Sequence, residues 1–299
     1  MTKKTKTILK RVGLSFAGII IVLAGAAGGF LLGQETFKQV RDYSKYKIDD
    51  EDFSEVYNRY EKMSPSKYYS SFSDVELVNI GLINITKCEH LYSISQGLVK
   101  AAGVNQTIRA ATIRDGDKYF EENIAASSFV KAANRFYQEG ETTSWYKGKY
   151  VSLTTGNYTN PTETNYTLDE FAKTWGRTLD DPCIYNITNQ TYLSGTMTKD
   201  TDGNHVVELD LEPILSVIRY VEQMKMTGGL STPPIFHSVK LTFVLDENVR
   251  IVSFTTNEVY DVHKIIDAKN SKGSLTQKFY YSPREIPSLE EQVNYEEEA

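Results

Sequence analysis

The side chains best suited to catalysis or metal binding lie far apart in this sequence. None of the four histidines has a second histidine or a cysteine at the spacing that zinc sites use. They are His90, His205, His237 and His263. The carboxylates Asp180 and Asp181 are adjacent, and adjacent side chains on a strand point to opposite faces, which is poor geometry for shared acid–base work.

Two short segments resemble functional motifs only in part. Ser64 and Ser128 each begin an S-x-x-K segment, but the companion motifs of penicillin-binding enzymes are absent. Residues 200–204 resemble a calcium loop without its third carboxylate and terminal glutamate, and they are typical of a hairpin turn. There is also no P-loop and no G-x-S-x-G. We therefore expect no enzymatic activity, no catalytic residue, no metal and no cofactor.

The chain has two cysteines, Cys88 and Cys183. A disulfide between them would close a loop of about 95 residues and stabilise the fold by about 4–5 kcal/mol in the chain-entropy model. The alternative is two separate buried thiols, because sequence does not show whether the two Cα atoms lie close enough to be bridged.

An uncharged run at residues 13–33 follows a basic head at residues 1–12. As a helix this run would span about 30 Å, the thickness of a bilayer core, and positive flanking residues stay on the cytoplasmic side. We therefore expect a single-pass signal anchor in the cell membrane, with the rest of the chain outside the cytoplasm. The alternative is a signal peptide cleaved near Ala24–Ala26, which would give a secreted protein.

Three glycines, Gly25, Gly29 and Gly33, recur every four residues within this run. Small residues at this spacing let two membrane helices approach closely, so the pattern favours dimerisation through this face. The alternative is the ordinary glycine content of membrane helices.

Composition narrows the range of partners. The net charge is −6, and no basic patch is interleaved with aromatic residues, so we expect no nucleic-acid binding. The 20 tyrosines suit half-buried strands.

Helix signals appear at four places after the anchor. Residues 53–60 carry an apolar stripe at helical spacing that Pro65 ends, and a capping box at Ser73 and Glu76 begins a second helix. Another capping box, at Thr167 and Glu170, begins a helix that Gly176 closes. The apolar residues of the fourth helix follow Pro213 and are Ile214, Val217, Ile218, Val221 and Met224.

Strand signals fill the remainder in two blocks. Alternating and β-branched segments joined by short turns predict strands over about 91–153 and again over about 191–281, whereas the turn-rich residues 154–167 predict a long surface loop. We expect a stalk and juxtamembrane helix at 34–64, an extracytoplasmic α+β domain at 65–287, and an acidic tail at 288–299. The sequence leaves open whether the two blocks form one sheet or two small domains.

The order of these elements resembles that of a known superfamily. The hairpins IRDGDKYFEENIAAS and NRFYQEGETTSWYKGKYV precede a helix, the hairpin SVKLTFVLDENVRIVSFTTNEVYDV and the strand LTQKFYY. This order resembles the LolA-like periplasmic lipoprotein carriers over about residues 65–285. It departs from them in its membrane helix, which favours a tethered protein over one that shuttles.

This resemblance implies a fold class and a site. The fold would be α+β: an N-terminal transmembrane helix, then a curved antiparallel sheet (an open half-barrel) with helices packed on its concave face. A cavity there would hold an acyl chain; the residues we place in it are Phe171, Trp175, Ile214, Val217, Ile218, Val221 and Met224. The alternative is that these residues form ordinary core.

We therefore expect a membrane-anchored extracytoplasmic binding or sensor domain for a lipid or other amphiphile. The alternative is a structural or interaction protein of the cell envelope, with a filled core and a protein partner.

Overall fold

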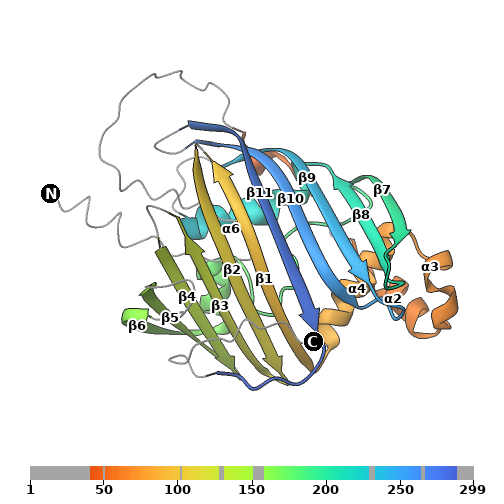
Figure 1. Ribbon diagram of the computed structural model, residues 1–299, viewed down its shortest axis with the longest axis horizontal. Helices are drawn as coiled ribbons and strands as arrows, with labels where there is room; N and C mark the ends of the chain where they lie inside the picture. The colour runs from red at the N-terminus through yellow and green to blue at the C-terminus, as the bar shows by residue number, and fades with distance from the viewer. Residues whose placement is uncertain are drawn as a thin grey trace.

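A computed structural model describes residues 41–49, 51–101, 103–127, 131–150, 158–228, 233–263 and 267–287. Most of these residues belong to one antiparallel sheet of 11 strands in the order β6-β5-β4-β3-β2-β1-β11-β10-β9-β8-β7 (Figure 1). The strands are β1 (His90–Ala101), β2 (Val104–Asp115), β3 (Lys118–Ala126), β4 (Lys131–Glu139), β5 (Thr142–Tyr150), β6 (Tyr158–Thr167), β7 (Tyr192–Lys199), β8 (His205–Leu211), β9 (Ile235–Leu245), β10 (Ile251–His263) and β11 (Asp267–Tyr280).

The first and last strands lie side by side at the centre of this sheet. β1 pairs with β2 on one side and with β11 on the other, so that Ser95 lies between Ala110 and Gln277. Every other neighbouring pair of strands is joined by a hairpin or by a segment that contains a helix. The pairing of β1 with β11 therefore joins the two strand blocks into one sheet.

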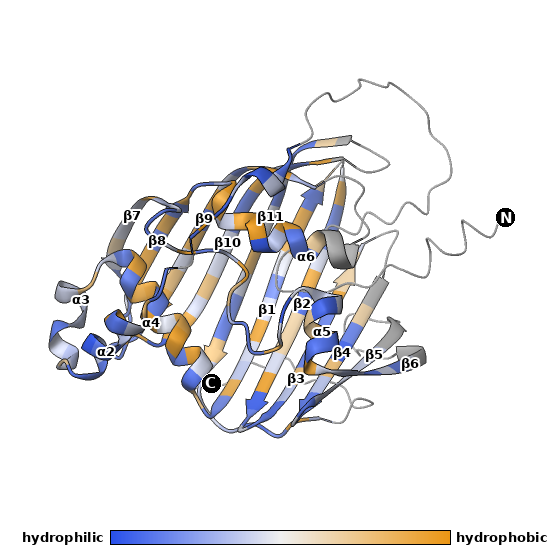
Figure 2. Cartoon of the chain, turned by 180° about the vertical axis from the view of Figure 1, so that it is seen from behind, coloured by the Kyte–Doolittle hydropathy of each residue, from blue (hydrophilic) through white to orange (hydrophobic). Residues whose placement is uncertain are grey.

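The helices are short and gather on one face of the sheet, which we call the helix face (Figure 2). The α-helices are α2 (Ser54–Glu61), α3 (Tyr68–Ser71), α4 (Asp74–Lys87), α5 (Leu168–Trp175) and α6 (Ile218–Gly228). The 3-10 helices are η1 (Tyr43–Lys45), η2 (Pro65–Lys67) and η3 (Leu215–Val217). Both capping boxes form, at Ser73 on α4 and at Thr167 on α5, as the sequence predicts.

Two apolar clusters hold the helices on this face. The larger one contains Val78 of α4, Val221 of α6, and Leu241 and Phe243 of β9, all of them buried. The other packs Phe171 and Trp175 of α5 against Phe136 of β4. Apolar residues at helical spacing meet alternating apolar residues on strands in both clusters, which is the burial that amphipathic patterns dictate.

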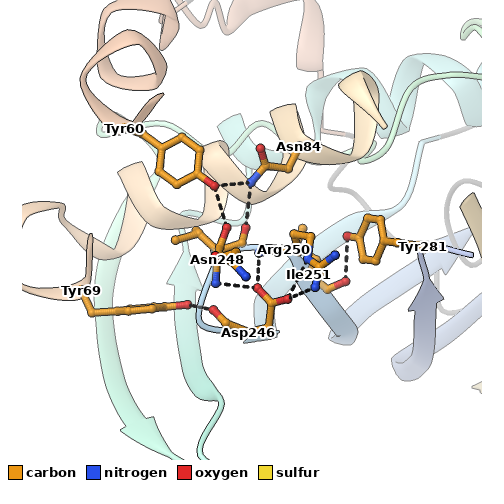
Figure 3. A network of polar contacts seen from close by, with 9 residues as sticks. Tyr60, Tyr69, Asn84, Asp246, Asn248, Arg250, Ile251 and Tyr281 are labelled. Atoms are coloured by element: carbon orange, nitrogen blue, oxygen red, sulfur yellow. Dashed lines mark hydrogen bonds and ion pairs between the residues drawn. The ribbon is translucent and has the colours of Figure 1, made fainter. Parts of the chain in front are cut away.

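The turn between β9 and β10 fixes the N-terminal helices to the end of the sheet (Figure 3). Tyr60 of α2 donates to the carbonyl of Asn248 (2.7 Å), and Asn84 of α4 donates to the carbonyl of Val249 (3.1 Å). Val249 has a φ of 57°, an unusual value for a β-branched residue, and its side chain is fully buried. Packing and hydrogen bonds together therefore hold this turn in its left-handed conformation.

The predicted fold class is wrong. The chain is mostly β: one large 11-stranded sheet carries a few short helices, where we expected an α+β domain led by a transmembrane helix. No helix among the described residues is long and apolar enough to cross a membrane. Residues 13–33, which include Gly25, Gly29 and Gly33, lie outside the described residues.

The prediction of a surface loop at residues 154–167 is also wrong over most of its length, since residues 158–167 form β6. Its turn-forming residues are tolerated because β6 lies at the end of the strand order, where Pro161 falls beside a shift in register with β5. The domain boundary between residues 64 and 65 stays a prediction; Phe53 and Tyr57, on its N-terminal side, pack in the larger cluster.

Candidate functional site

An irregular segment crosses the helix face between α5 and β7. We call residues 177–185 the covering segment. It begins where Gly176 ends α5 in the left-handed conformation, with a φ of 68°, and turns the chain onto the sheet. Leu179, Ile184 and Tyr185 are buried, so the segment packs onto the sheet as a cover.

A cavity of about 100 Å³ lies between this segment and the five neighbouring strands β10, β11, β1, β2 and β3. Its floor is built from small side chains on one face of β1 and β2, where Ser93 lies opposite Thr112, and Ser95 opposite Ala110. Larger residues at these positions would fill the space. The cavity therefore results from short side chains under a cover that does not reach them.

The lining of this cavity is amphipathic. Gln277 of β11 donates to the hydroxyl of Ser93 (2.8 Å), which makes an uncharged polar floor. Ile108, Phe254 and Leu275 line the same space with apolar groups. A cavity of this composition suits a ligand that has both an apolar part and groups that form hydrogen bonds.

An ion pair closes one end of the cavity. Arg177 of the covering segment binds Glu121 of β3, and both side chains are buried. Asn123, one pleat further along β3, also donates to Glu121. Because a buried charge is costly without its partner, this pair anchors the start of the covering segment.

A carboxyl group anchors the C-terminal end of the covering segment. The hydroxyl of Tyr185 donates to Glu258 of β10, which is fully buried, and burial raises the pKa of Glu258 to about 8. Among the described residues, neither the second carboxyl oxygen of Glu258 nor the hydroxyl of Tyr260 has a hydrogen-bond partner. The covering segment therefore rests on buried acidic residues at both ends.

The seven residues that we predicted to contact a ligand lie in two places. Phe171 and Trp175 belong to the cluster of α5 on β4, while Val217, Val221 and Met224 belong to the larger core cluster, with Ile214 and Ile218 at its edge. None of the seven lines the cavity under the covering segment. Their role in binding stays a prediction.

Sequence reasoning missed the residues that do line it. Ser93 and Ser95 alternate on β1 as polar residues on an inward face, and a periodicity search assigns such residues to solvent. The covering segment has no hydrophobic periodicity of a helix or a strand. The one local signal next to it is Gly176, which indicates where α5 ends but not the path of the chain after the helix.

Both cysteines are free thiols in the structure. Cys183 lies in the covering segment, and burial raises the pKa of its thiol to about 12. Cys88 follows α4, and burial raises the pKa of its thiol as well. Their pairing in solution stays a prediction.

The polar side chains of the described residues do not converge on a metal centre. No group of three or more histidine, cysteine or acidic side chains among them could hold a metal ion. His205 stacks on Tyr69 with ring centroids 3.3 Å apart, and His237 lies 3.0 Å from Asp261. The cavity under the covering segment is therefore the candidate site.

Comparison with known proteins finds only distant structural similarity. No protein-family model and no curated protein sequence matches the chain. LprF from Mycobacterium bovis is 11% identical with a TM-score of 0.33, over 72% of this chain and 96% of LprF. A DUF1329 family protein from Desulfovibrio piger ATCC 29098 is 12% identical with a TM-score of 0.25, over 70% of this chain and 91% of that protein. TM-scores this low carry no inference about this chain.

Proposed function

We propose that this protein is a non-catalytic binding domain that holds an amphiphile between the helix face and the covering segment. The observation that carries the proposal is the covered cavity, with its uncharged polar floor at Ser93 and Gln277 and its apolar lining. Apolar burial would supply affinity, at about 0.8 kcal/mol for each methylene group taken out of water.

The cavity in its present form is smaller than most ligand pockets, which hold about 300–1,000 Å³. An amphiphile longer than a few atoms therefore has to displace the covering segment. The covering segment is the part of the cavity wall best suited to open, because no backbone hydrogen bond joins it to another described element.

A cavity-filling variant tests the proposal. Ala110 is buried and lines the cavity, so Ala110→Leu removes space without adding a polar group. We expect the affinity for the uncharged dansyl amide of dodecylamine to fall at least tenfold in a fluorescence titration of the full chain. Thr107→Leu, an exposed position on the same strand, is the control and should bind as the unmodified protein does. Equal affinities in all three proteins, or no binding to the unmodified one, would count against the proposal.

The edge of the sheet favours a second candidate function, the recruitment of a protein partner. β7 ends the strand order, and it exposes Leu193 (61%) and Met197 (39%). An exposed apolar edge strand can accept an extended peptide as an additional strand. Met197→Lys should then abolish capture of a partner protein while amphiphile binding persists. Capture that persists in this variant would exclude β7 as the docking site.

A further inference from the structure

The covering segment separates the cavity from a second space on its outer side. A groove of about 290 Å³ lies between this segment, α4 and the chain that precedes α2, and we call it the α4 groove. Asp181, Pro182, Cys183 and Tyr185 line both the cavity and the groove. The wall between the two spaces is therefore one residue thick.

The groove continues the amphipathic lining of the cavity. Phe53, Leu82 and Ile83 give it apolar walls, with Asn79 and Thr86 on the same helix as the last two. The two volumes together come to about 390 Å³, which falls within the range of ligand pockets, whereas the cavity alone is too small.

Cys183 and Ile184 are buried in the larger cluster, but the middle of the covering segment makes weaker polar contacts than its ends. No backbone hydrogen bond joins residues 177–185 to another described element; the first one on its C-terminal side is Asn186 to Ser216 (2.8 Å). Between the two buried anchors, Arg219 of α6 binds the side chain of Asp181 and contacts the carbonyl of Cys183 (3.5 Å). Arg219 is 45% exposed, so solvent competes with this contact.

We propose that the cavity and the α4 groove are the two halves of one ligand site, and that residues 180–184 open locally between them. This inference rests on the proposed function for the identity of the ligand, but the opening itself can be measured without any ligand. Local opening of a segment with few backbone hydrogen bonds requires far less free energy than global unfolding.

The charges of the groove indicate which amphiphiles fit. Asp49, Glu51 and Asp181 face one cation, Arg219, so the groove carries a net formal charge of −2. Asp49 and Glu51 form no ion pair with a described residue; Glu51 accepts hydrogen bonds from Asn189. The apolar part of the ligand would lie in the cavity and its uncharged or cationic head in the groove, since an anionic head would be repelled.

Cys183 reports the opening, because it is 7% exposed and lines both spaces. In the full chain with Cys88→Ser, we expect Cys183 to react with a maleimide at a rate that low urea concentrations leave unchanged. Arg219→Gln should raise this rate about fivefold, the effect of one partly exposed ion pair. Arg59→Gln, which breaks the similarly exposed pair of Arg59 with Glu76, is the control and should leave the rate unchanged.

Two outcomes overturn the inference. A labelling rate that rises steeply with urea from the lowest concentrations would show that Cys183 is reached only by global unfolding. Equal rates for Arg219→Gln and Arg59→Gln would show that Arg219 does not hold the segment closed.

Ligand protection tests the head group separately. Dodecyltrimethylammonium below its micelle concentration should slow the labelling of Cys183 at least threefold more than dodecanoate does. Equal protection by the two would contradict the charge assignment of the groove. If labelling shows local opening and no amphiphile protects, then the proposed function fails while the opening stands.

Discussion

Glu258 is the residue whose titration should control the stability of this fold. Its carboxyl group is fully buried, and burial raises its pKa from 4.5 to about 8, while the hydrogen bond from Tyr185 acts in the opposite direction. The fold therefore favours the protonated acid. The stabilisation is fully present below the pKa of the unfolded chain and is lost as the pH rises through about 8.

We expect the free energy of unfolding to decrease by roughly 3–6 kcal/mol between about pH 5 and pH 9 through this group. Urea unfolding across that range measures it, and Glu258→Gln should flatten the curve because its amide does not titrate. If the free energy of unfolding falls with pH equally in both proteins, the carboxyl group of Glu258 is not the group that causes the loss. Tyr185→Phe should move the loss to higher pH, since the tyrosine lowers the pKa.

Sequence could not reveal this pair. The sequence around Glu258 predicts an ordinary strand. Tyr185 comes 73 residues earlier, in a segment without hydrophobic periodicity. The same applies to Arg177 and Glu121, which are 56 residues apart. Contacts of this kind depend on the path of the covering segment across the sheet, and local patterns do not contain that path.

Among the elements, α5 depends on its capping box. Thr167 accepts from the backbone of Glu170 (3.3 Å), and Glu170 accepts from the backbone of Thr167 (2.9 Å). Thr167→Ala should lower the free energy of unfolding by about 1 kcal/mol, because two backbone groups at the start of the helix lose this arrangement. Thr174→Ala, an exposed position inside the same helix, should leave stability unchanged or raise it slightly in the same urea experiment. Equal effects would exclude a role for the cap.

The pairing of β1 with β11 depends on a glycine. A Cβ atom at Gly97 would lie 2.6 Å from the carbonyl oxygen of Ser274 and 2.8 Å from Cδ1 of Leu275. Gly97→Ala should therefore destabilise the protein by about 1–3 kcal/mol, because the two strands must move apart. Ser95→Ala, on the same face of β1, should change stability less. A thermal melt in which both variants unfold together with the unmodified protein would contradict the close approach.

Elements with local signals were predicted correctly. The capping boxes of α4 and α5 and the hairpin of β2 with β3 each depend on residues within a few positions of one another. β6 was missed because its asparagine, threonine and proline content is typical of a loop, and only pairing with β5 makes it a strand. Tertiary pairing overrides propensity most easily at such an edge.

At the scale of the whole molecule, the union of β1 with β11 decides the fold. Ser93 and Gln277, which form a hydrogen bond across this junction, are 184 residues apart in the sequence. No local pattern indicates that two strand blocks meet in this way. The helices cover only part of one face of an 11-stranded sheet (Figure 2). The α+β prediction is wrong because strands make up much more of the fold than helices do.

The measurement that tests the account most directly is native mass spectrometry of the full chain, before and after organic extraction. We predict an additional mass in the range of a single amphiphile, removed by extraction and absent from Ala110→Leu. The same spectrum reports a disulfide between Cys88 and Cys183 as a deficit of about two hydrogen atoms. A bare chain before extraction, which also fails to take up an added uncharged amphiphile, would contradict binding under the covering segment.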